Sequence, residues 1–221
     1  MELSFDPDQA VAVLARADRR LARVIKKAGP FTHRPGKLEN PFQYLLRAIV
    51  YQQLTGKAAA TIFSRVAALH PGRGAFRPEA LLGTRDQKLR ACGLSRAKTA
   101  AVKDLAAKAL DGMLPTLAKL KKMDDAEIVA RLTEVRGVGP WTVEMLLIFR
   151  LGRPDVLPVS DYGVRNGFML TYGKKELPTA KELLSHGERW RPYRSIASWY
   201  MWRAVDLARE KSKNGQLILP G

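Results

Sequence analysis

LTEVRGVGPWTVEMLLIFRLGRPDVLPVSDY, residues 132–162, is the stretch that decides the fold of this chain. A polar helix end leads into Gly137-Val138-Gly139-Pro140, an apolar helix follows, and a lone carboxylate, Asp161, comes 22 residues after Gly139. Glycines allow a tight hairpin between two helices, and such a hairpin presents backbone N–H groups that can bind an anion. Phosphate is the obvious candidate for that anion. Taken alone, the tetrapeptide is equally compatible with an ordinary corner in which glycine ends one helix and proline begins the next.

The composition favours an anion-binding role. The 221 residues include 38 Lys and Arg against 21 Asp and Glu, which gives a formal net charge of +17. This excess predicts attraction to a polyanion, although charge alone does not separate nucleic acid from an acidic membrane surface. No apolar run is long enough to span a bilayer, and the first residues lack the pattern of a signal peptide. We therefore expect a cytoplasmic protein that spans no membrane.

The single cysteine, Cys92, limits the chemistry available to the chain. One thiol cannot form an internal disulfide, a cysteine-ligated zinc site or an iron–sulfur cluster. We expect no required cofactor.

Helical periodicity runs through almost the whole chain, and the one strand-like stretch is Leu217-Ile218-Leu219. Turn residues form two linkers, 30–41 and 154–158, and a loop at 71–74. Ser95 and Asp124 are expected to be N-caps. The pattern predicts an all-α fold with helices at 8–27, 42–54, 57–69, 78–82, 86–91, 96–109, 125–134, 141–150, 161–170, 179–190 and 192–211.

The sequence around Gly137-Val138-Gly139-Pro140 resembles that of the helix-hairpin-helix DNA glycosylases of the HhH-GPD superfamily. In that superfamily an apolar residue precedes G-V-G, a helix follows, and an aspartate comes further along the chain. The chain is most similar to the DNA-3-methyladenine glycosylase II (AlkA-like) branch. Four segments carry the resemblance: 51–54 with 57–59, 93–98, the hairpin through Tyr162, and 188–195 with Trp199 and Trp202. Because the space before Pro41 is short and helical, we expect the compact form without an N-terminal β domain.

The resemblance implies one catalytic domain, residues 1–221, with a two-lobed helix-hairpin-helix fold. Lobe one is expected to comprise residues 1–38 and 156–221. Lobe two, residues 39–155, is expected to carry the hairpin and the wedge, which is the side chain that fills the gap left in the duplex when a base is extruded. The active site would lie in the cleft between the lobes.

The resemblance assigns catalysis to Asp161. Cleavage of an N-glycosidic bond passes through an oxocarbenium-like sugar, and a nearby carboxylate stabilises that charge and can orient the attacking water. An aspartate at the start of a predicted helix could also be a simple N-cap. Glu144, one turn into the hairpin helix, could face the active site, but we expect it on a solvated helix face. One catalytic carboxylate fits cationic alkylated purines of the 3-methyladenine and 7-methylguanine type, whose departure needs no protonation.

Trp141 indicates the type of reaction. Bifunctional relatives place a lysine directly after the G-V-G-x turn, and its amine attacks the sugar. An indole cannot do so, and we expect a monofunctional enzyme of base excision repair that leaves an abasic site. Two alternatives stay open: a non-catalytic helix-hairpin-helix DNA-binding module, and a glycosylase for oxidised or deaminated bases.

An aromatic pocket is expected to receive the base, which must leave the duplex stack before it can react. Met145 stands where a relative has tyrosine, and Trp190 and Trp199 are expected to pack in the core. The gap in the duplex would be filled by a wedge, Gln53 or Leu54, although helix capping by Gln52 and Gln53 is an equal alternative. The residues expected to line the pocket are Trp141, Met145, Tyr162 and Trp202.

The expected partner is double-stranded DNA that contains damaged bases, bound by a monomer. Lys103 is expected on the same DNA-facing surface as the phosphate ligands, although a solvated face is an equal alternative. The resemblance further implies a monovalent cation, Na⁺ or K⁺, at the backbone carbonyls of Thr133, Val135 and Val138. The expected phosphate-binding residues are Gly137, Gly139, Thr142, Arg96 and Lys98.

Overall fold

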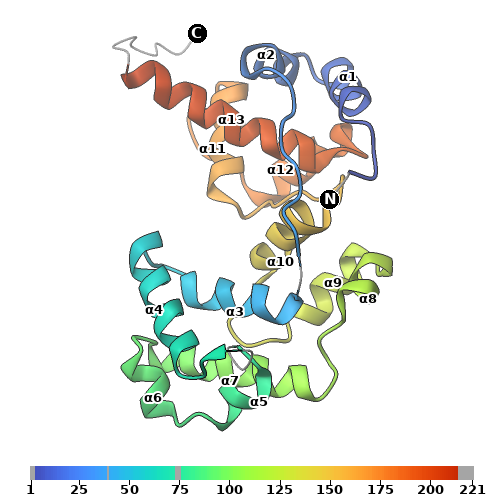
Figure 1. Cartoon of the computed structure of the whole chain (residues 1–221). Helices are drawn as coiled ribbons and strands as arrows, with labels where there is room; N and C mark the ends of the chain where they lie inside the picture. The colour runs from blue at the N-terminus through green and yellow to red at the C-terminus, as the bar shows by residue number, and fades with distance from the viewer. Residues whose placement is uncertain (1–2, 39, 73–75, 214–221) are drawn as a thin grey trace. The chain divides into compact units, whose positions relative to one another are not determined.

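The computed structural model describes residues 3–38, 40–72 and 76–213, and every regular element in these ranges is a helix (Figure 1). The predicted all-α class is confirmed. The predicted strand Leu217-Ile218-Leu219 and residues 73–74 of the predicted loop lie outside the described residues. None of the described helices is long and apolar enough to cross a membrane.

Contacts between residues divide the chain into two compact units. Unit 1 comprises Met1–Gly36 and Glu144–Gly221, and unit 2 comprises Lys37–Val143. The expected limits differ from these, because lobe two was expected to continue to residue 155. The segment 144–155 instead belongs with the two chain ends, since the Phe149 ring in this segment packs against His33 and Trp202.

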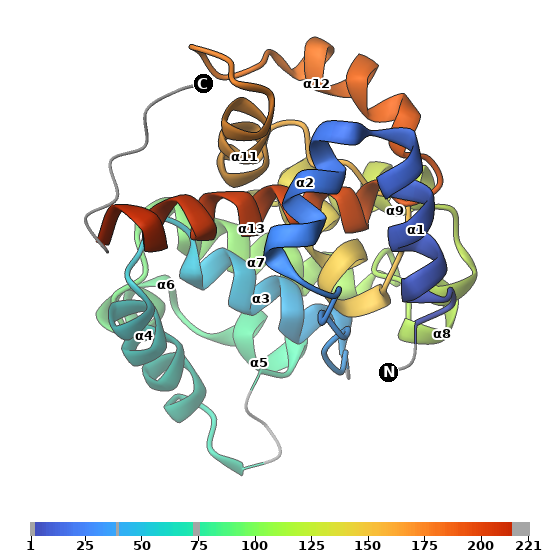
Figure 2. The same cartoon turned by 90° about the horizontal axis from the view of Figure 1, so that it is seen from above.

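Unit 1 is organised around one long helix, α13 (Arg194–Lys213), which packs against α11 (Tyr162–Tyr172) and α2 (Arg19–Ala28), as Figures 1 and 2 show. Gly167 lies where α11 crosses α13, and a Cβ at this position would overlap the backbone of Met201. The other helices of this unit are α1 (Pro7–Ala17), the π-helical turn η2 (Leu147–Leu151), α12 (Ala180–Gly187) and the 3₁₀ turn η3 (Glu188–Trp190).

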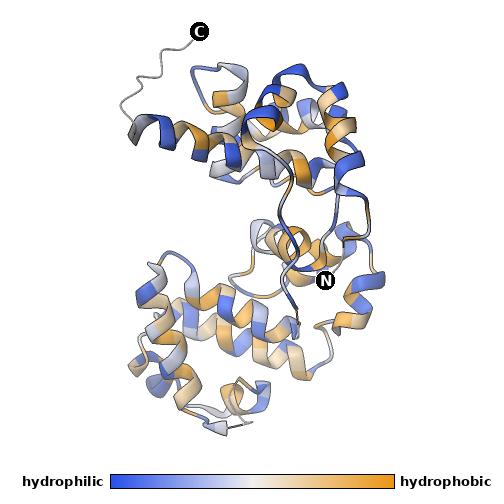
Figure 3. Cartoon of the chain, turned by 45° about the horizontal axis from the view of Figure 1, so that its top comes forward, coloured by the Kyte–Doolittle hydropathy of each residue, from blue (hydrophilic) through white to orange (hydrophobic). Residues whose placement is uncertain are grey.

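The core of unit 1 is formed by apolar side chains from the two ends of the chain. Trp190 is fully buried within it and Trp199 packs against it, so both tryptophans lie where the sequence predicted. Figure 3 shows hydrophilic and hydrophobic positions alternating along the helices of this unit, as expected for amphipathic helices. The fully buried members include Leu14, Leu21, Val164, Leu183, Trp190, Ile196 and Tyr200.

The predicted helix at 8–27 is wrong, because the chain turns at Asp18 and forms two helices, α1 and α2. Asp18 has extended backbone geometry and is 5% exposed, and its Oδ1 caps two backbone amides of α2. Its Oδ2 accepts hydrogen bonds from the Tyr172 hydroxyl and from Trp190 Nε1, and lies 2.9 Å from His186 Nε2. A buried carboxylate needs such partners. The helical period continues across Asp18, so the sequence does not show the break.

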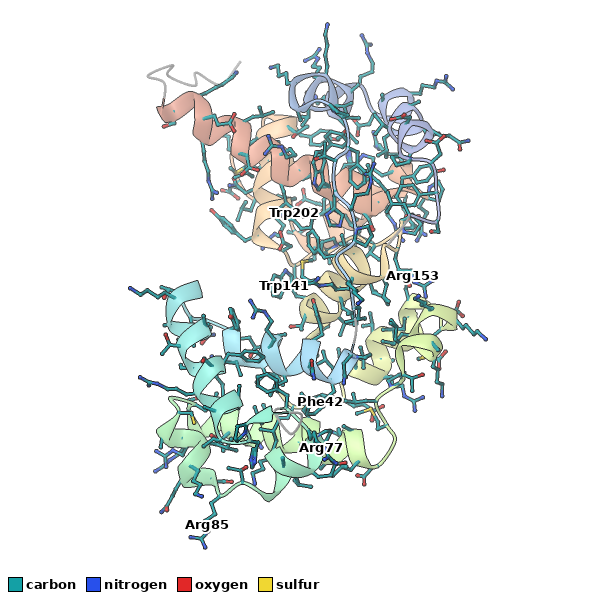
Figure 4. The ribbon with its side chains drawn as sticks, in the orientation of Figure 1. Phe42, Arg77, Arg85, Trp141, Arg153 and Trp202 are labelled. Carbon is teal, nitrogen blue, oxygen red and sulfur yellow. The ribbon has the colours of Figure 1, made fainter. Side chains whose placement is uncertain are left out.

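Unit 2 is built around α7 (Arg96–Leu110), which packs against α3 (Pro41–Tyr51), α5 (Pro78–Gly83) and α6 (Asp86–Ala91). Phe42, labelled in Figure 4, is buried in this unit, whereas Arg85 extends from its surface. The remaining helices are α4 (Gly56–Ala68), α8 (Leu117–Lys122), α9 (Asp125–Leu132) and α10 (Pro140–Leu146), the last of which continues into unit 1.

The predicted caps of unit 2 are confirmed in one case and half confirmed in the other. The Ser95 hydroxyl accepts a hydrogen bond of 3.2 Å from the Lys98 amide at the start of α7. Asp124 occupies the N-cap position of α9 but makes no side-chain capping bond. Helix α8 was not expected, because its six residues bury only Leu120 and therefore show no helical stripe.

Candidate active site

Asp161 is held in place by two hydrogen bonds to one carboxylate oxygen. It is the N-cap of α11, and its Oδ1 accepts the Val164 amide at 2.7 Å. The same oxygen accepts Trp202 Nε1 at 2.8 Å. Asp161 can therefore cap α11 and still have the expected catalytic role. The bond from the indole fixes the orientation of the carboxylate, which capping alone does not require.

Trp202 lies on α13 (Figure 4) and links Asp161 to the segment that follows the hairpin. Its ring packs on Phe149 of η2 with centroids 5.4 Å apart and an angle of 31° between the rings. Gly163 makes the close approach possible, because a Cβ there would lie 2.6 Å from Cδ1 and 2.8 Å from Nε1 of the indole. Trp202 therefore supports the carboxylate, a role that the sequence did not indicate.

Glu144 is a second carboxyl group in the same unit, and the expectation that it lies on a solvated helix face is wrong. Its side chain is half-buried, and its Oε2 is buried with no hydrogen-bond partner among the described residues. Burial, and then the negative charge of Asp161, raises the pKa of Glu144 to about 7. The sequence contained a signal for this, because a helix that is apolar nearly all round has no solvated face.

The predicted pocket residues are distributed over both units. Met145 and Tyr162 belong to unit 1 with Trp202, whereas Trp141 belongs to unit 2. Tyr162 is 65% exposed and directly follows Asp161, and Trp141 is 46% exposed. The structure thus joins Trp202 to Asp161 by a hydrogen bond, and Tyr162 directly follows Asp161 in the chain. The pocket itself stays a prediction.

The hairpin in unit 2 has the geometry that its glycines predict. Gly137 has a φ of +78°, and a Cβ there would lie 3.3 Å from Ala101 Cβ. Helix α7 supports the turn, since the Arg136 amide donates to Asp104 Oδ2 at 2.8 Å. Gly137 and Gly139 are both exposed, as anion-binding amides must be.

Thr142 does not fit the phosphate-binding role that we expected. Its side chain is 5% exposed, and its amide donates to the Gly139 carbonyl at 3.0 Å. The residue lies in the first turn of α10, where this amide closes the turn and the side chain packs inward.

The turn after α3, which contains the predicted wedge, is tied to the hairpin. Gln52 Nε2 donates to the Gly137 carbonyl at 2.7 Å. Gln53 is exposed with a φ of +56°, and Leu54 is 40% exposed. Positive φ at a residue other than glycine is strained and is found often at functional sites. This geometry presents both predicted wedge residues to solvent.

Lys98 and Lys103 were expected to face DNA, but both use their ammonium groups inside unit 2. Lys98 Nζ donates to the Val50 and Gln52 carbonyls, each at 2.7 Å, and burial lowers the pKa of Lys98. Lys103 Nζ donates to carbonyls at the end of α5. Both lysines bind orphan carbonyls at helix ends, a use that a basic sequence run does not reveal. Arg96 is exposed at the first position of α7, as expected of a phosphate ligand.

The carbonyls expected to bind a monovalent cation lie between α9 and α10. The Val135 carbonyl accepts the Val138 amide at 3.0 Å, which leaves one lone pair for another partner. The cation stays a prediction. Among the described residues, no group of three or more His, Cys, Asp or Glu side chains could hold a metal ion.

Comparisons with known proteins identify the family. Residues 46–192 match the profile of the HhH-GPD superfamily base excision DNA repair proteins. DNA-3-methyladenine glycosylase 1 of Schizosaccharomyces pombe is 35% identical over 196 residues, which cover 88% of this chain and 86% of that protein.

Two solved structures are similar over nearly the whole chain. The 3-methyladenine DNA glycosylase of Schizosaccharomyces pombe, in complex with abasic DNA, has a TM-score of 0.77 at 36% identity, covering 90% of this chain and 98% of that one. A DNA-3-methyladenine glycosidase of Bacillus halodurans has a TM-score of 0.81 at 35% identity, covering 95% and 94%. The resemblance seen in the sequence is confirmed: the chain belongs to the HhH-GPD superfamily of base excision DNA repair proteins.

Proposed function

We propose that this protein is a DNA glycosylase that hydrolyses the N-glycosidic bond of alkylated purines, of the 3-methyladenine and 7-methylguanine type, in base excision repair. The observation that carries the proposal is the fixed carboxylate of Asp161, bound by the Val164 amide and the Trp202 indole. The names of the similar glycosylases support the same substrate class.

Asp161 would act on the sugar. As the bond to the base lengthens, positive charge develops on the deoxyribose, and a carboxylate that is already oriented stabilises it without further rearrangement. The same carboxylate can orient the attacking water. An alkylated purine carries a positive charge before it leaves, so it departs as a neutral base and can be held by aromatic rings meanwhile.

We further propose that the enzyme has no lyase activity. Trp141 stands directly after the hairpin, and an indole offers no amine to attack the sugar. The product would be an abasic site in an intact strand.

Duplex DNA with a damaged base is the proposed partner, bound by a monomer in the cytoplasm. The exposed hairpin glycines, Gly137 and Gly139, and the net charge of +17 support binding to DNA. Gln53 or Leu54 would fill the space that the extruded base leaves.

Asp161→Asn tests the proposal. The amide keeps the size of the side chain and can still cap α11, but it removes the negative charge. Single-turnover excision of 7-methylguanine should fall by about 10²–10³-fold, because electrostatic stabilisation of this kind is typically worth that much. Affinity for lesion DNA should change little. The matched control is Asp6→Asn, since Asp6 also caps a helix of unit 1 through its side chain and should leave excision unchanged.

Near-normal excision by Asp161→Asn would reduce Asp161 to a cap and overturn the catalytic assignment. Failure of the unmodified protein to release any alkylated base would favour the non-catalytic DNA-binding alternative. Release of oxidised or deaminated bases alone would favour the other glycosylase class. Borohydride added during turnover should trap no covalent complex, and a trapped adduct would contradict the absence of a lyase step.

A further inference from the structure

Glu144 is a half-buried carboxyl group that the proposed mechanism does not yet use. Its neighbours Val143, Leu146 and Leu147 are buried, so its helix has apolar surroundings. Oε2 is buried with no hydrogen-bond partner among the described residues. A buried polar atom without a partner costs free energy, and one kept in a folded protein calls for an explanation. A hydrogen-bond partner that arrives with the substrate would explain why Oε2 has none in the free protein.

The position of Glu144 relates it to Asp161. Helix α10 continues directly into η2, whose Phe149 packs on Trp202 at 5.4 Å between ring centroids. Trp202 in turn donates to Asp161 Oδ1 at 2.8 Å. The chain segment that carries Glu144 is therefore packed against the indole that holds the catalytic carboxylate.

The electrostatics agree with this placement. The negative charge of Asp161 adds to burial in raising the pKa of Glu144 to about 7. Burial and the neighbouring negative charge both disfavour the ionised form of Glu144 and so favour its acid form. Enzymes that use one carboxyl group as acid and another as anion separate their roles by environment in this way.

We propose that Glu144 is a second catalytic group, a carboxylic acid that donates its proton to the departing base when that base is electrically neutral. The inference rests on the proposed glycosylase function and extends its substrates to uncharged damaged purines. Cationic bases need no such donor, so Glu144 would determine lesion class and would not be needed for every excision.

The step balances as a hydrolysis. The O–H bond of Glu144 breaks as an N–H bond forms on a ring nitrogen of the base. The C1′–N bond breaks with its electron pair moving to the base, and Asp161 stabilises the cationic sugar. Water then adds to C1′, and the proton that it loses restores the acid. The products are a neutral base and an abasic sugar, with no further reactant.

Glu144→Gln separates the two substrate classes. Single-turnover excision is measured for duplexes with hypoxanthine or 1,N⁶-ethenoadenine, which are neutral, and with 7-methylguanine, which is cationic. Loss of a general acid should slow excision of at least one neutral base by about 10²-fold or more. Excision of 7-methylguanine should stay within about threefold, since its departure requires no proton. Glu210→Gln, an exposed carboxyl group on α13, is the matched control and should change neither.

The pH profile provides a readout that a purely structural role would not change. For the unmodified protein, excision of a neutral base should decline as the pH rises above about 7, because the acid form of Glu144 is lost. In Glu144→Gln this decline should disappear. Equal loss of both substrate classes, or no loss, would overturn the inference. Removal of 7-methylguanine but no neutral base by the unmodified protein would also overturn it, while the proposed glycosylase function would stand.

Thermal unfolding tests the protonation of Glu144 without any substrate. A carboxyl group whose pKa is raised by folding stabilises the protein below its unfolded pKa of 4.5 and loses that contribution as the pH rises through about 7. Glu144→Gln should therefore have a higher Tm than the unmodified protein at about pH 8.5, and the difference should vanish near the unfolded pKa. A Tm difference independent of pH would show that Glu144 is ionised and solvated, contrary to the inference.

Discussion

The indole of Trp202 makes two contacts with different consequences. Its ring packs on Phe149, and its N–H group donates to Asp161. The resemblance places this residue in the base pocket, and the structure adds that it orients the carboxylate. A change at Trp202 would therefore disturb stacking and catalysis together, so a neighbouring residue gives a cleaner test.

Gly163→Ala is that test. The new Cβ would lie within 2.8 Å of two atoms of the indole, so Trp202 must move and its hydrogen bond to Asp161 must lengthen or break. Because a displacement of about 1 Å can cost about 10²-fold in rate, single-turnover excision of 7-methylguanine should fall by at least roughly tenfold. The control is Gly83→Ala, since a Cβ on Gly83 meets nothing within 4 Å. Full activity in Gly163→Ala would show that the indole bond has no catalytic importance.

At the scale of elements, the boundary between α1 and α2 depends on contacts made far along the chain. Asp18 and His186 are separated by 168 positions, and Asp18 and Trp190 by 172. The carboxylate thus connects the two N-terminal helices to α11, α12 and η3 through partly or fully buried hydrogen bonds. This network lies in the core of unit 1 and serves stability.

Asp18→Asn should lower stability in a pH-dependent way. Burial raises the pKa of Asp18, but hydrogen bonds from His186, Tyr172 and the Leu21 amide outweigh it and hold the pKa below its ordinary value of 3.8. The stabilisation is therefore present above that value and is lost as the pH falls through the lower, folded-state pKa. At neutral pH the variant should lose about 1.5–3 kcal/mol, the range for hydrogen bonds to a charged group.

Urea unfolding across this pH range measures the effect. The difference between Asp18→Asn and the unmodified protein should shrink progressively below the ordinary pKa of 3.8. Asp6→Asn, a change at an exposed cap, serves as the control and should cost less at neutral pH. A constant difference at all pH values would mean that the charge of Asp18 contributes nothing.

At the scale of the whole molecule, the excess of basic residues should control binding to DNA, but not every basic residue contributes equally. Arg96 is exposed, whereas Lys98 donates to two carbonyls of unit 2. The two residues lie in the same turn of α7, so they form a matched pair.

Arg96→Gln should change DNA binding, whereas Lys98→Gln should change stability. Affinity for undamaged duplex should fall with salt, each neutralised phosphate contributing a log–log slope of about −0.9. Arg96→Gln should reduce the magnitude of that slope by about one with an unchanged Tm. Lys98→Gln should lower the Tm, because it leaves carbonyls at the end of α3 without their donor. A salt slope near zero in the unmodified protein would contradict electrostatic binding, and a reduced slope without a change of Tm in Lys98→Gln would contradict its structural role.

The local chemistry of the sequence determined the all-α class, most helix ends, the glycine hairpin and the position of Asp161 at the start of a helix. These features depend on residues a few positions apart: the helical period, the cap at Ser95 and the φ of +78° at Gly137. Short-range sterics and hydrogen bonding decide such features locally, so they can be predicted from the amino-acid sequence.

Only the tertiary structure decided which charged groups are buried and what they contact. Glu144 was expected in solvent and is half-buried, and Lys98 was expected on DNA and binds carbonyls 46 and 48 positions away. Trp202 meets Asp161 across 41 positions. Burial and charge interactions depend on which distant segments become neighbours, and a long polar side chain can point either outward or inward from the same helix. The amino-acid sequence supplied the catalytic candidate, and packing determined what holds it and which second carboxyl group interacts with it.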